Sequence, residues 1–233
     1  MKSGLTYIIF VIDRSGSMSA IRADMIGGFN SFIKAQRDAN IGDCRVFAYK
    51  FDTEYETIFE NLDVNKVPDL TNETYEPRGG TALYNSLGKT INDIGAKLAA
   101  LPESERPEKV LVVTITDGED NSVLSNFSVS EYNSSKVKEM VKHQTENYKW
   151  DFAYIGANQD AWAVGSSMGV TNNLNYVADS AGTAYAFDNL TKSTLSYRSA
   201  GPARAFAFTP DTSAVEVNVS VNPAKAPKTK KTA

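Results

Sequence analysis

The chain has 233 residues, of which 42% are hydrophobic and 22% charged, an ordinary balance for one folded domain with or without appendages. Its 24 basic and 28 acidic side chains give a net charge of −4, which excludes a chain-wide basic field for binding nucleic acid. A single Cys (Cys44) and a single His (His143) exclude a disulfide framework and any zinc site built from several Cys or His ligands.

Strand-like and helix-like segments alternate along most of the chain. Two strand-like segments, 5–12 and 110–116, are uninterrupted apolar runs rich in β-branched residues, which indicates strands buried on both faces. The helix-like segments carry apolar residues three or four positions apart, and Ser128 and Glu131 fit a capping box. In chain order we predict strand 5–12, helix 19–38, strand 44–51, edge strand 55–62, helix 83–98, strand 110–116, helix 128–147, strand 150–155, helix 160–168, strand 174–177 and helix 183–197.

This order of elements predicts an α/β fold. Strands that alternate with helices form a mostly parallel, Rossmann-like doubly wound sheet with helices on both faces. The segment 55–62 follows its predecessor after a short turn, so we expect it to form a short antiparallel edge strand.

The character of the sequence changes after residue 200. Four valines alternate with polar residues over 215–221, which predicts a strand with one buried face, and 205–208 is its predicted hairpin partner. From residue 222 onward Pro, Ala, Lys and Thr dominate, with four lysines and no acid, which is typical of a disordered tail. We therefore divide the chain into a domain at 1–199, a C-terminal β-strand extension at 200–221 and a disordered Lys-rich tail at 222–233.

The sequence predicts no membrane span. The longest apolar run, 5–12, is far shorter than the roughly 20 residues that a spanning helix needs. It ends at Asp13 and Arg14 without a clear signal-peptidase site, so a signal peptide is the weaker interpretation. Together with the single Cys, this favours a cytoplasmic protein.

Three polar loops contain the residues that suggest chemistry. Asp13 and Asp117 directly follow the two most apolar strands, and a Gly79–Gly80 pair allows a third loop to approach them. In an open α/β sheet, ligands bind beyond the carboxyl ends of the central strands. If these two strands are neighbours, five oxygen-bearing side chains converge there: Asp13, Ser15, Ser17, Thr81 and Asp117. Carboxylates and hydroxyls suit Mg²⁺, or Mn²⁺ or Ca²⁺, better than zinc or copper.

These loops resemble the metal-ion-dependent adhesion site of von Willebrand factor type A (VWA) domains. Asp13-x-Ser15-x-Ser17, Thr81 after a glycine pair and Asp117-Gly118 fill all five positions of that motif in order. The loops after 12 and 116 and the segment 152–160 are similar to stand-alone bacterial and phage members, including tellurium-resistance-associated ones. The resemblance covers about 5–199. It implies a six-stranded sheet and a cytoplasmic setting in a bacterium or a phage-infected host.

The resemblance also implies a function. VWA domains use the metal to contact an Asp or Glu of a partner protein rather than to catalyse a reaction. A MoxR-type AAA+ ATPase is one candidate partner, because some bacterial members work with such enzymes. We expect no nucleic-acid or membrane partner.

Three alternatives stay open from the sequence alone. Ser17 could simply cap the helix that it precedes. Asp13 could be the aspartyl nucleophile of a phosphatase-like enzyme, although such enzymes place a second acid two residues later, where this chain has Ser15. The chain could also be a structural or assembly protein, for example phage-encoded, that forms homo-oligomers by pairing its C-terminal strand with a neighbouring chain.

Overall fold

The computed structural model describes residues 1–121, 131–158 and 160–209. The predicted strand at 215–221, the Lys-rich tail at 222–233 and the predicted helix start at Ser128 lie outside the described residues.

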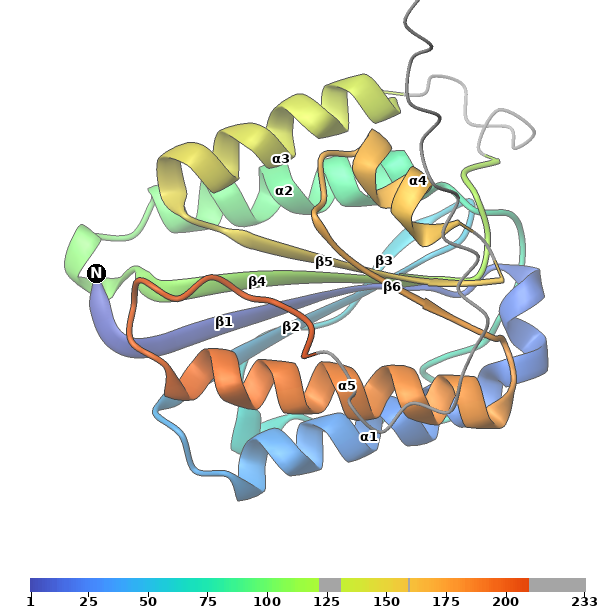
Figure 1. Cartoon of the computed structure of the whole chain (residues 1–233), viewed down its shortest axis with the longest axis horizontal. Coiled ribbons are helices and arrows are strands. Elements are labelled where there is room, and N and C mark those ends of the chain that lie inside the picture. Colours follow the sequence, from blue (N-terminus) through green and yellow to red (C-terminus); the bar gives the residue numbers. More distant parts are fainter. Residues whose placement is uncertain (122–130, 159, 210–233) are drawn as a thin grey trace, which may run out of the picture.

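A six-stranded sheet forms the centre of the molecule (Figure 1). Its spatial order is β3-β2-β1-β4-β5-β6. All neighbouring strands are parallel except β2 and β3, which pair as an antiparallel hairpin at one edge. The strands are β1 (Lys2–Asp13), β2 (Asp43–Phe51), β3 (Tyr55–Asp63), β4 (Pro107–Thr116), β5 (Asp151–Ala157) and β6 (Asn172–Tyr176). The predicted mostly parallel α/β sheet with an antiparallel edge strand is confirmed.

Helices cover both faces of this sheet (Figure 1). Helices α1 (Arg22–Asp38) and α5 (Ser180–Ser199) lie on one face. The other face carries α2 (Leu83–Ala99), α3 (Ser134–Tyr148) and α4 (Ala161–Ser167). Three short 3-10 turns complete the elements: η1 (Gly16–Ile21), η2 (Val64–Lys66) and η3 (Glu103–Glu105).

The central strand β1 explains why two separate layers of core form. Ile8, Phe10 and Ile12 point to the α1 and α5 side, and Phe10 contacts the rings of Phe29 and Phe32. The alternate residues of β1 belong to the core on the α2 and α3 side. Both sets are almost fully buried because successive strand residues face opposite sides of a sheet covered on both faces.

Two local expectations were wrong. Helix α3 begins at Ser134, where the Asn133 side chain accepts a hydrogen bond from the backbone N–H of Lys136, so Glu131 lies outside the helix. Residues 205–208 are not in a strand. This segment instead packs beside α5, where the ring of Phe206 meets Tyr197 at a centroid distance of 5.9 Å, so side-chain burial rather than strand pairing holds it.

No helix in the described part of the chain is long and apolar enough to cross a membrane.

Two adjacent glycines in α1 have opposite surroundings. A Cβ on Gly28 would lie 2.1 Å from the ring of Phe187 on α5, so the absence of a side chain allows the two helices to approach. A Cβ on Gly27 would meet nothing within 4 Å.

We therefore expect Gly28→Ala to lower the free energy of unfolding by roughly 1–3 kcal/mol, because it overpacks the contact with Phe187. Gly27→Ala is the matched control and should raise it by about 0.5–1 kcal/mol through helix propensity. Urea denaturation of the two variants measures both changes. Equal effects at the two positions would show that Phe187 does not limit the packing.

Candidate metal site

The candidate site lies where β1 and β4 end. These strands are parallel neighbours and stay in register up to the pair Ile12 and Ile115. The loops that begin at Asp13 and Asp117 therefore leave the same edge of the sheet side by side. The sequence prediction required these two strands to be neighbours, and they are.

Asp13 is the most deeply buried of the predicted ligands, with 0% of the residue exposed. One carboxylate oxygen accepts a hydrogen bond from the backbone N–H of Ser15 at 2.6 Å, and the other accepts one from the Thr116 hydroxyl, also at 2.6 Å. The hydroxyl of Tyr75 donates to the Asp13 backbone carbonyl at 2.7 Å. These contacts hold the side chain in one orientation at the end of β1.

A chain of hydroxyls connects the two strand ends. The Oγ atoms of Ser15 and Ser17 lie 3.0 Å apart, and Ser17 Oγ donates to Asp117 Oδ1 at 2.6 Å. Ser15 is the N-cap residue of η1, but its side chain makes no capping hydrogen bond. Ser17 lies inside η1 and the N-cap residue of α1 is Ile21, so Ser17 caps neither element, and its hydroxyl bonds Asp117 instead.

The third loop places Thr81 beside this chain. The Gly16 N–H donates to the Gly79 carbonyl at 3.1 Å, and Gly79 has a φ of +67°, which favours glycine. A Cβ on Gly118 would lie 3.6 Å from Thr81 Oγ1, so the Thr81 hydroxyl lies next to the turn that follows Asp117. The structure thus brings all five predicted residues to one place.

Asn121 fixes the position of Thr81. Its side-chain oxygen accepts the Thr81 backbone N–H at 2.6 Å, and its own N–H donates to the Thr81 carbonyl at 2.9 Å. A Cβ on Gly80 would lie 2.7 Å from that side-chain oxygen, so a glycine is needed for the close approach. The Asp120 carboxylate accepts a hydrogen bond from the N–H of Tyr84 in the first turn of α2 at 3.2 Å.

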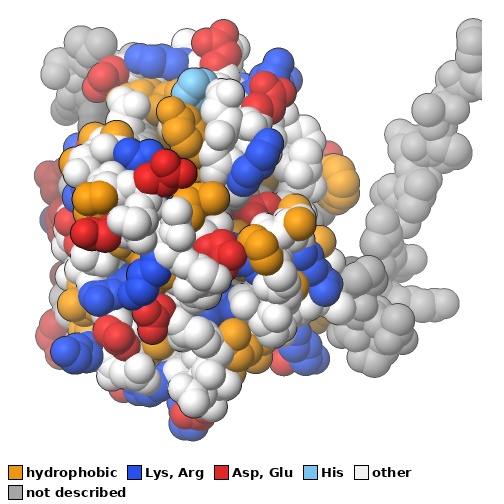
Figure 2. All heavy atoms as spheres, turned by 90° about the vertical axis from the view of Figure 1, so that its left-hand side faces the viewer, with side chains coloured by type: hydrophobic (Ala, Val, Ile, Leu, Met, Phe, Trp, Pro, Cys, Tyr) orange, Lys and Arg blue, Asp and Glu red, His pale blue; other side chains and the backbone are white. Residues whose placement is uncertain are grey.

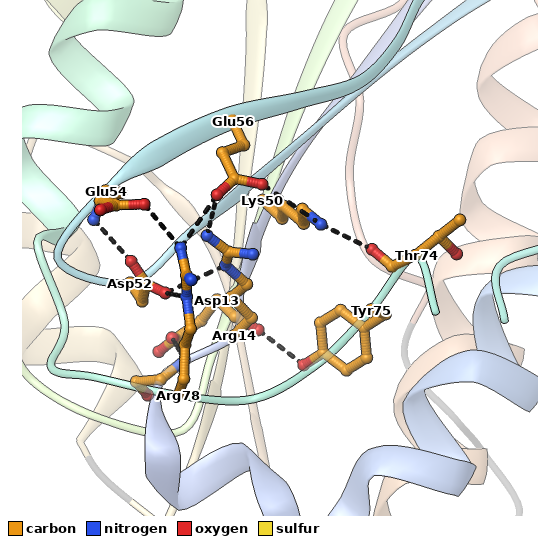
Figure 3. Close-up of polar contacts among 10 residues, drawn as sticks. Asp13, Arg14, Lys50, Asp52, Glu54, Glu56, Thr74, Tyr75 and Arg78 are labelled. Atoms are coloured by element: carbon orange, nitrogen blue, oxygen red, sulfur yellow. Dashed lines mark hydrogen bonds and ion pairs between the residues drawn. The ribbon is translucent and has the colours of Figure 1, made fainter. Parts of the chain in front are cut away.

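An ion cluster next to the site joins the loops to the β2–β3 hairpin (Figure 3). We call it the Asp52 ion cluster; its members are Arg14, Lys50, Asp52, Glu54, Glu56 and Arg78. Asp52 Oδ2 lies 3.1 Å from Arg14 Nε and 2.8 Å from Arg78 Nε. The side chains of Arg14 and Asp52 are only 4% and 1% exposed. Arg14 also meets Glu56 at 2.6 Å, so its guanidinium points away from Asp13 and toward the hairpin.

Backbone hydrogen bonds reinforce this connection. The Ala82 N–H donates to the Asp52 carbonyl at 2.9 Å, and the Arg78 N–H donates to the Arg14 carbonyl at 2.7 Å. Both ends of the loop that carries Thr81 are therefore attached to residues next to Asp13 or at the end of β2.

Burial dominates the electrostatics of the two carboxylates. It raises the pKa of Asp13 to about 7, although the hydrogen bonds from Thr116 and Ser15 lower it, and the charge of Asp117 raises it further. Burial also raises the pKa of Asp117, while the hydrogen bond from Ser17 lowers it. Neither carboxylate forms an ion pair with another described residue.

The donor set fits a hard divalent cation. Two carboxylates and three hydroxyls are oxygen donors of the kind that Mg²⁺, Mn²⁺ and Ca²⁺ prefer. No group of three or more His, Cys, Asp and Glu able to hold a metal occurs among the described residues, so a cation here depends on the hydroxyls as well as the acids.

Sequence reasoning missed the residues that support the five. Tyr75, Thr116, Asn121 and Asp52 each contact the site or its loops from another segment. Of these four residues, Thr116 was the easiest to predict from the sequence. It ends a strand directly before Asp117, where its hydroxyl can reach the end of the neighbouring strand.

Comparison with solved structures identifies the fold. The chain matches the vWF domain of the type V pili tip protein Mfa5 from Porphyromonas gingivalis with a TM-score of 0.60 at 13% identity, over 84% of this chain and 97% of that one. It matches the PilB minor pilin from Streptococcus sanguinis with a TM-score of 0.57 at 13% identity, over 82% and 61% of the two chains. For a von Willebrand factor type A protein from Catenulispora acidiphila the TM-score is 0.53 at 14% identity, over 82% and 42%.

The chain has the VWA fold. At these identities the likeness shows the fold alone, and the chain spans less than two thirds of the PilB and Catenulispora chains. No protein-family model and no curated protein sequence matches it. The resemblance to the tellurium-resistance subgroup stays a prediction.

Removing the charge of Asp52 should destabilise the fold. We expect Asp52→Asn to lower the free energy of unfolding by roughly 2–4 kcal/mol, less than for a wholly unpaired buried charge, because Arg14 keeps Glu56. Glu54→Gln is the control: its side chain is 65% exposed, and the change should stay within about 1 kcal/mol. Urea denaturation distinguishes the two, and an Asp52 variant as stable as the control would contradict the importance of the cluster.

The raised pKa of Asp13 predicts how metal-free protein responds to pH. Between about pH 4 and 7 the folded protein holds a proton that the unfolded chain has released, so the folded state is favoured at the acid end. The contribution of Asp13 to the unfolding free energy should fall by on the order of 4 kcal/mol across this range. Denaturation in EDTA at several pH values should show this fall in wild type and in the exposed-residue control Asp69→Asn. It should be absent in Asp13→Asn.

Proposed function

We propose that this chain is a divalent-cation-dependent protein-interaction module that binds an acidic residue of a partner through Asp13, Ser15, Ser17, Thr81 and Asp117. One observation carries the proposal. Two carboxylates at neighbouring strand ends are joined by hydroxyls, and neither has a cationic partner among the described residues. Arg14, the nearest basic residue in the sequence, faces the Asp52 ion cluster instead.

The five residues have two different roles in the proposed metal site. Asp13 and Asp117 supply the negative charge that balances a cation, while the hydroxyls of Ser15, Ser17 and Thr81 supply neutral oxygens. When bound, Mg²⁺ or Mn²⁺ provides a positive centre that can accept an external carboxylate. Neutral hydroxyl ligands leave that positive charge only partly neutralised, which favours an acidic partner group.

Access to the surface supports an intermolecular role. Asp13, Ser15 and Thr81 are buried, whereas Ser17 is exposed and Asp117 is half-buried. The cluster therefore has a closed inner side and an outer side that a partner side chain can reach.

An interaction role fits the residues better than catalysis. Ser15 occupies the position where an aspartyl phosphatase has its acid, and its hydroxyl lies 3.0 Å from that of Ser17. The matched structures include a pili tip protein, a minor pilin and a pilus adhesin from Lactobacillus rhamnosus GG. We infer that the chain is not an enzyme.

The partner is identified here by its chemistry, an exposed Asp or Glu on a protein. A MoxR-type AAA+ ATPase stays a candidate through the resemblance of the sequence, and so do the cytoplasmic location and a bacterial or phage origin. The acidic charge balance gives no support for a nucleic-acid partner.

Removing the charge of Asp13 should abolish metal and partner binding together. We expect Asp13→Ala to remain folded, because the substitution removes a buried carboxylate that lies beside Asp117. The variant should show no measurable heat of Mg²⁺ or Mn²⁺ binding in calorimetry. Thr81→Ala removes one neutral ligand and should weaken binding less. Ser19→Ala, an exposed serine in the same η1 turn, is the control and should bind as wild type does.

Partner binding is then tested by affinity capture with Mg²⁺ and with EDTA. A partner bound by wild type in Mg²⁺ should be lost in EDTA and with Asp13→Ala. Changing its contacting Asp or Glu to the amide should have the same effect. Unchanged partner affinity of metal-free Asp13→Ala protein would show that the site is not the interface.

A further inference from the structure

Exposed large hydrophobic side chains gather at the end of the molecule that holds the candidate metal site. Among the described residues, such side chains are Met1, Tyr148, Trp162, Val177 and Tyr185. Trp162 lies in the first turn of α4, which follows β5, Val177 directly follows β6, and Tyr185 lies near the start of α5. These last three therefore lie toward the carboxyl ends of the parallel strands, at the right of Figure 1. Trp162 is 60% exposed and Val177 is 55% exposed.

Hydrogen bonds join the segments that follow β5 and β6. The backbone N–H of Asn158 donates to the Tyr176 carbonyl at 3.0 Å, and the side-chain oxygen of Asn158 accepts the N–H of Ala178 at 3.0 Å. The side-chain oxygen of Asn175 accepts the N–H of Ala161, the first residue of α4, at 2.8 Å. The start of α4 and the turn after β6 are thus held together as one surface.

This surface adjoins Asp117. Only β5 separates β4 from β6 in the sheet, so the loops after these two strands begin about 10 Å apart. Burial raises the pKa of Tyr176 at the end of β6, and the charges of Asp117 and Asp13 raise it further, so these acids lie within electrostatic reach of its hydroxyl. A protein that reaches a cation at Asp117 therefore also meets the surface around Val177.

The stretches that carry these apolar side chains are acidic. After β4, β5 and β6 these stretches are 116–121, 157–167 and 176–185. They contain five acidic residues and no basic one. Glu119, Asp160 and Asp179 are exposed and form no ion pair with another described residue. By contrast, Arg14 and Arg78, which lie near the ends of β1 and β2, are paired within the Asp52 ion cluster.

The opposite end of the molecule has mixed charges. Figure 2 shows this end, where basic and acidic side chains are interspersed. The ion pair between Lys2 Nζ and Asp43 Oδ2, 2.7 Å apart, is one example. The stretches after β4, β5 and β6 differ from it in carrying charges of one sign only.

We propose that Glu119, Asp160, Trp162, Val177 and Asp179 bind the basic and apolar residues that flank the metal-ligating acid of a protein partner. We call these five residues the Trp162 surface. The inference rests on the proposed metal-dependent function. An acidic surface repels further carboxylates, so the partner must combine one acid for the cation with lysines or arginines around it. Exposed aromatic and aliphatic side chains beside polar ones are typical of protein interfaces, in which tryptophan is a frequent anchor.

Peptides displayed on phage, with a fixed central aspartate and random flanking residues, are the probe. Peptides selected on wild type in Mg²⁺ should be enriched in lysine, arginine and apolar residues. Trp162→Ala should weaken their binding about 10-fold or more. Asp160→Asn combined with Asp179→Asn should weaken it severalfold, because the charges are lost while asparagine still caps α4 and α5. All of these variants should bind Mg²⁺ in calorimetry as wild type does.

Matched controls lie at the opposite end. Tyr148→Ala removes an exposed aromatic side chain and Asp43→Asn an exposed charge, and both variants should bind the selected peptides as wild type does. Tryptophan fluorescence adds a direct measurement, because Trp150, the only other tryptophan, is buried. Acrylamide should quench Trp162 in the free protein, and a bound peptide should reduce this quenching.

The outcomes separate this inference from the proposed function. Mg²⁺-dependent peptides without the enrichment, or with binding unchanged by Trp162→Ala, would overturn the Trp162 surface and leave the metal-dependent function intact. Peptide binding that survives EDTA and Asp13→Ala, or the selection of no Mg²⁺-dependent peptide, would contradict the proposed function and this inference with it. Trp162 already shielded from acrylamide in the free protein would also overturn the inference, and light scattering would show whether a second copy covers it.

Discussion

The buried carboxylate of Asp13 is the constraint around which this end of the molecule is organised. A charge removed from water at the end of a central strand must be neutralised by a proton, hydrogen-bond donors or a cation. The protein supplies donors from two segments: the backbone N–H of Ser15 and the hydroxyl of Thr116 on β4. These contacts require β1 and β4 to be adjacent and in register, so the topology of the sheet and the composition of the site depend on each other.

A second buried carboxylate, Asp52, follows the neighbouring strand β2, but different groups neutralise it. Asp52 follows β2 as Asp13 ends β1, and both residues are fully buried. Asp52 is balanced by two arginines, whereas the donors that the described residues offer to the Asp13 carboxylate are neutral. Two carboxylates a strand apart thus have different surroundings, one within an ion cluster and the other among neutral hydrogen-bond donors. The Asp52 ion cluster holds Arg14 away from Asp13 and thereby preserves this difference.

The fold and the convergence of the five candidate residues could be predicted from the sequence, because each leaves a local pattern. Uninterrupted apolar runs marked β1 and β4, and oxygen-bearing residues at fixed spacing marked the loops after them. The supporting contacts left no such pattern: Tyr75 reaches Asp13 across 62 residues, and Asn121 reaches Thr81 across 40. The start of α3 was misplaced because Ser128-x-x-Glu131 and Asn133 are both plausible caps, and only the actual hydrogen bond to Lys136 decides between them.

The hydrogen bond between Thr116 and Asp13 also has a kinetic consequence. It joins residues 103 positions apart, whereas the β2–β3 hairpin that carries Asp52 closes a loop of a few residues. Local pairings form early in folding, and pairings between distant segments must first overcome the entropy of closing a long loop. The hairpin can therefore assemble before the Asp13 site, which is complete only when β1 and β4 have paired. A chain that has not finished folding therefore lacks the assembled cluster at Asp13, even where the hairpin with Asp52 has already formed.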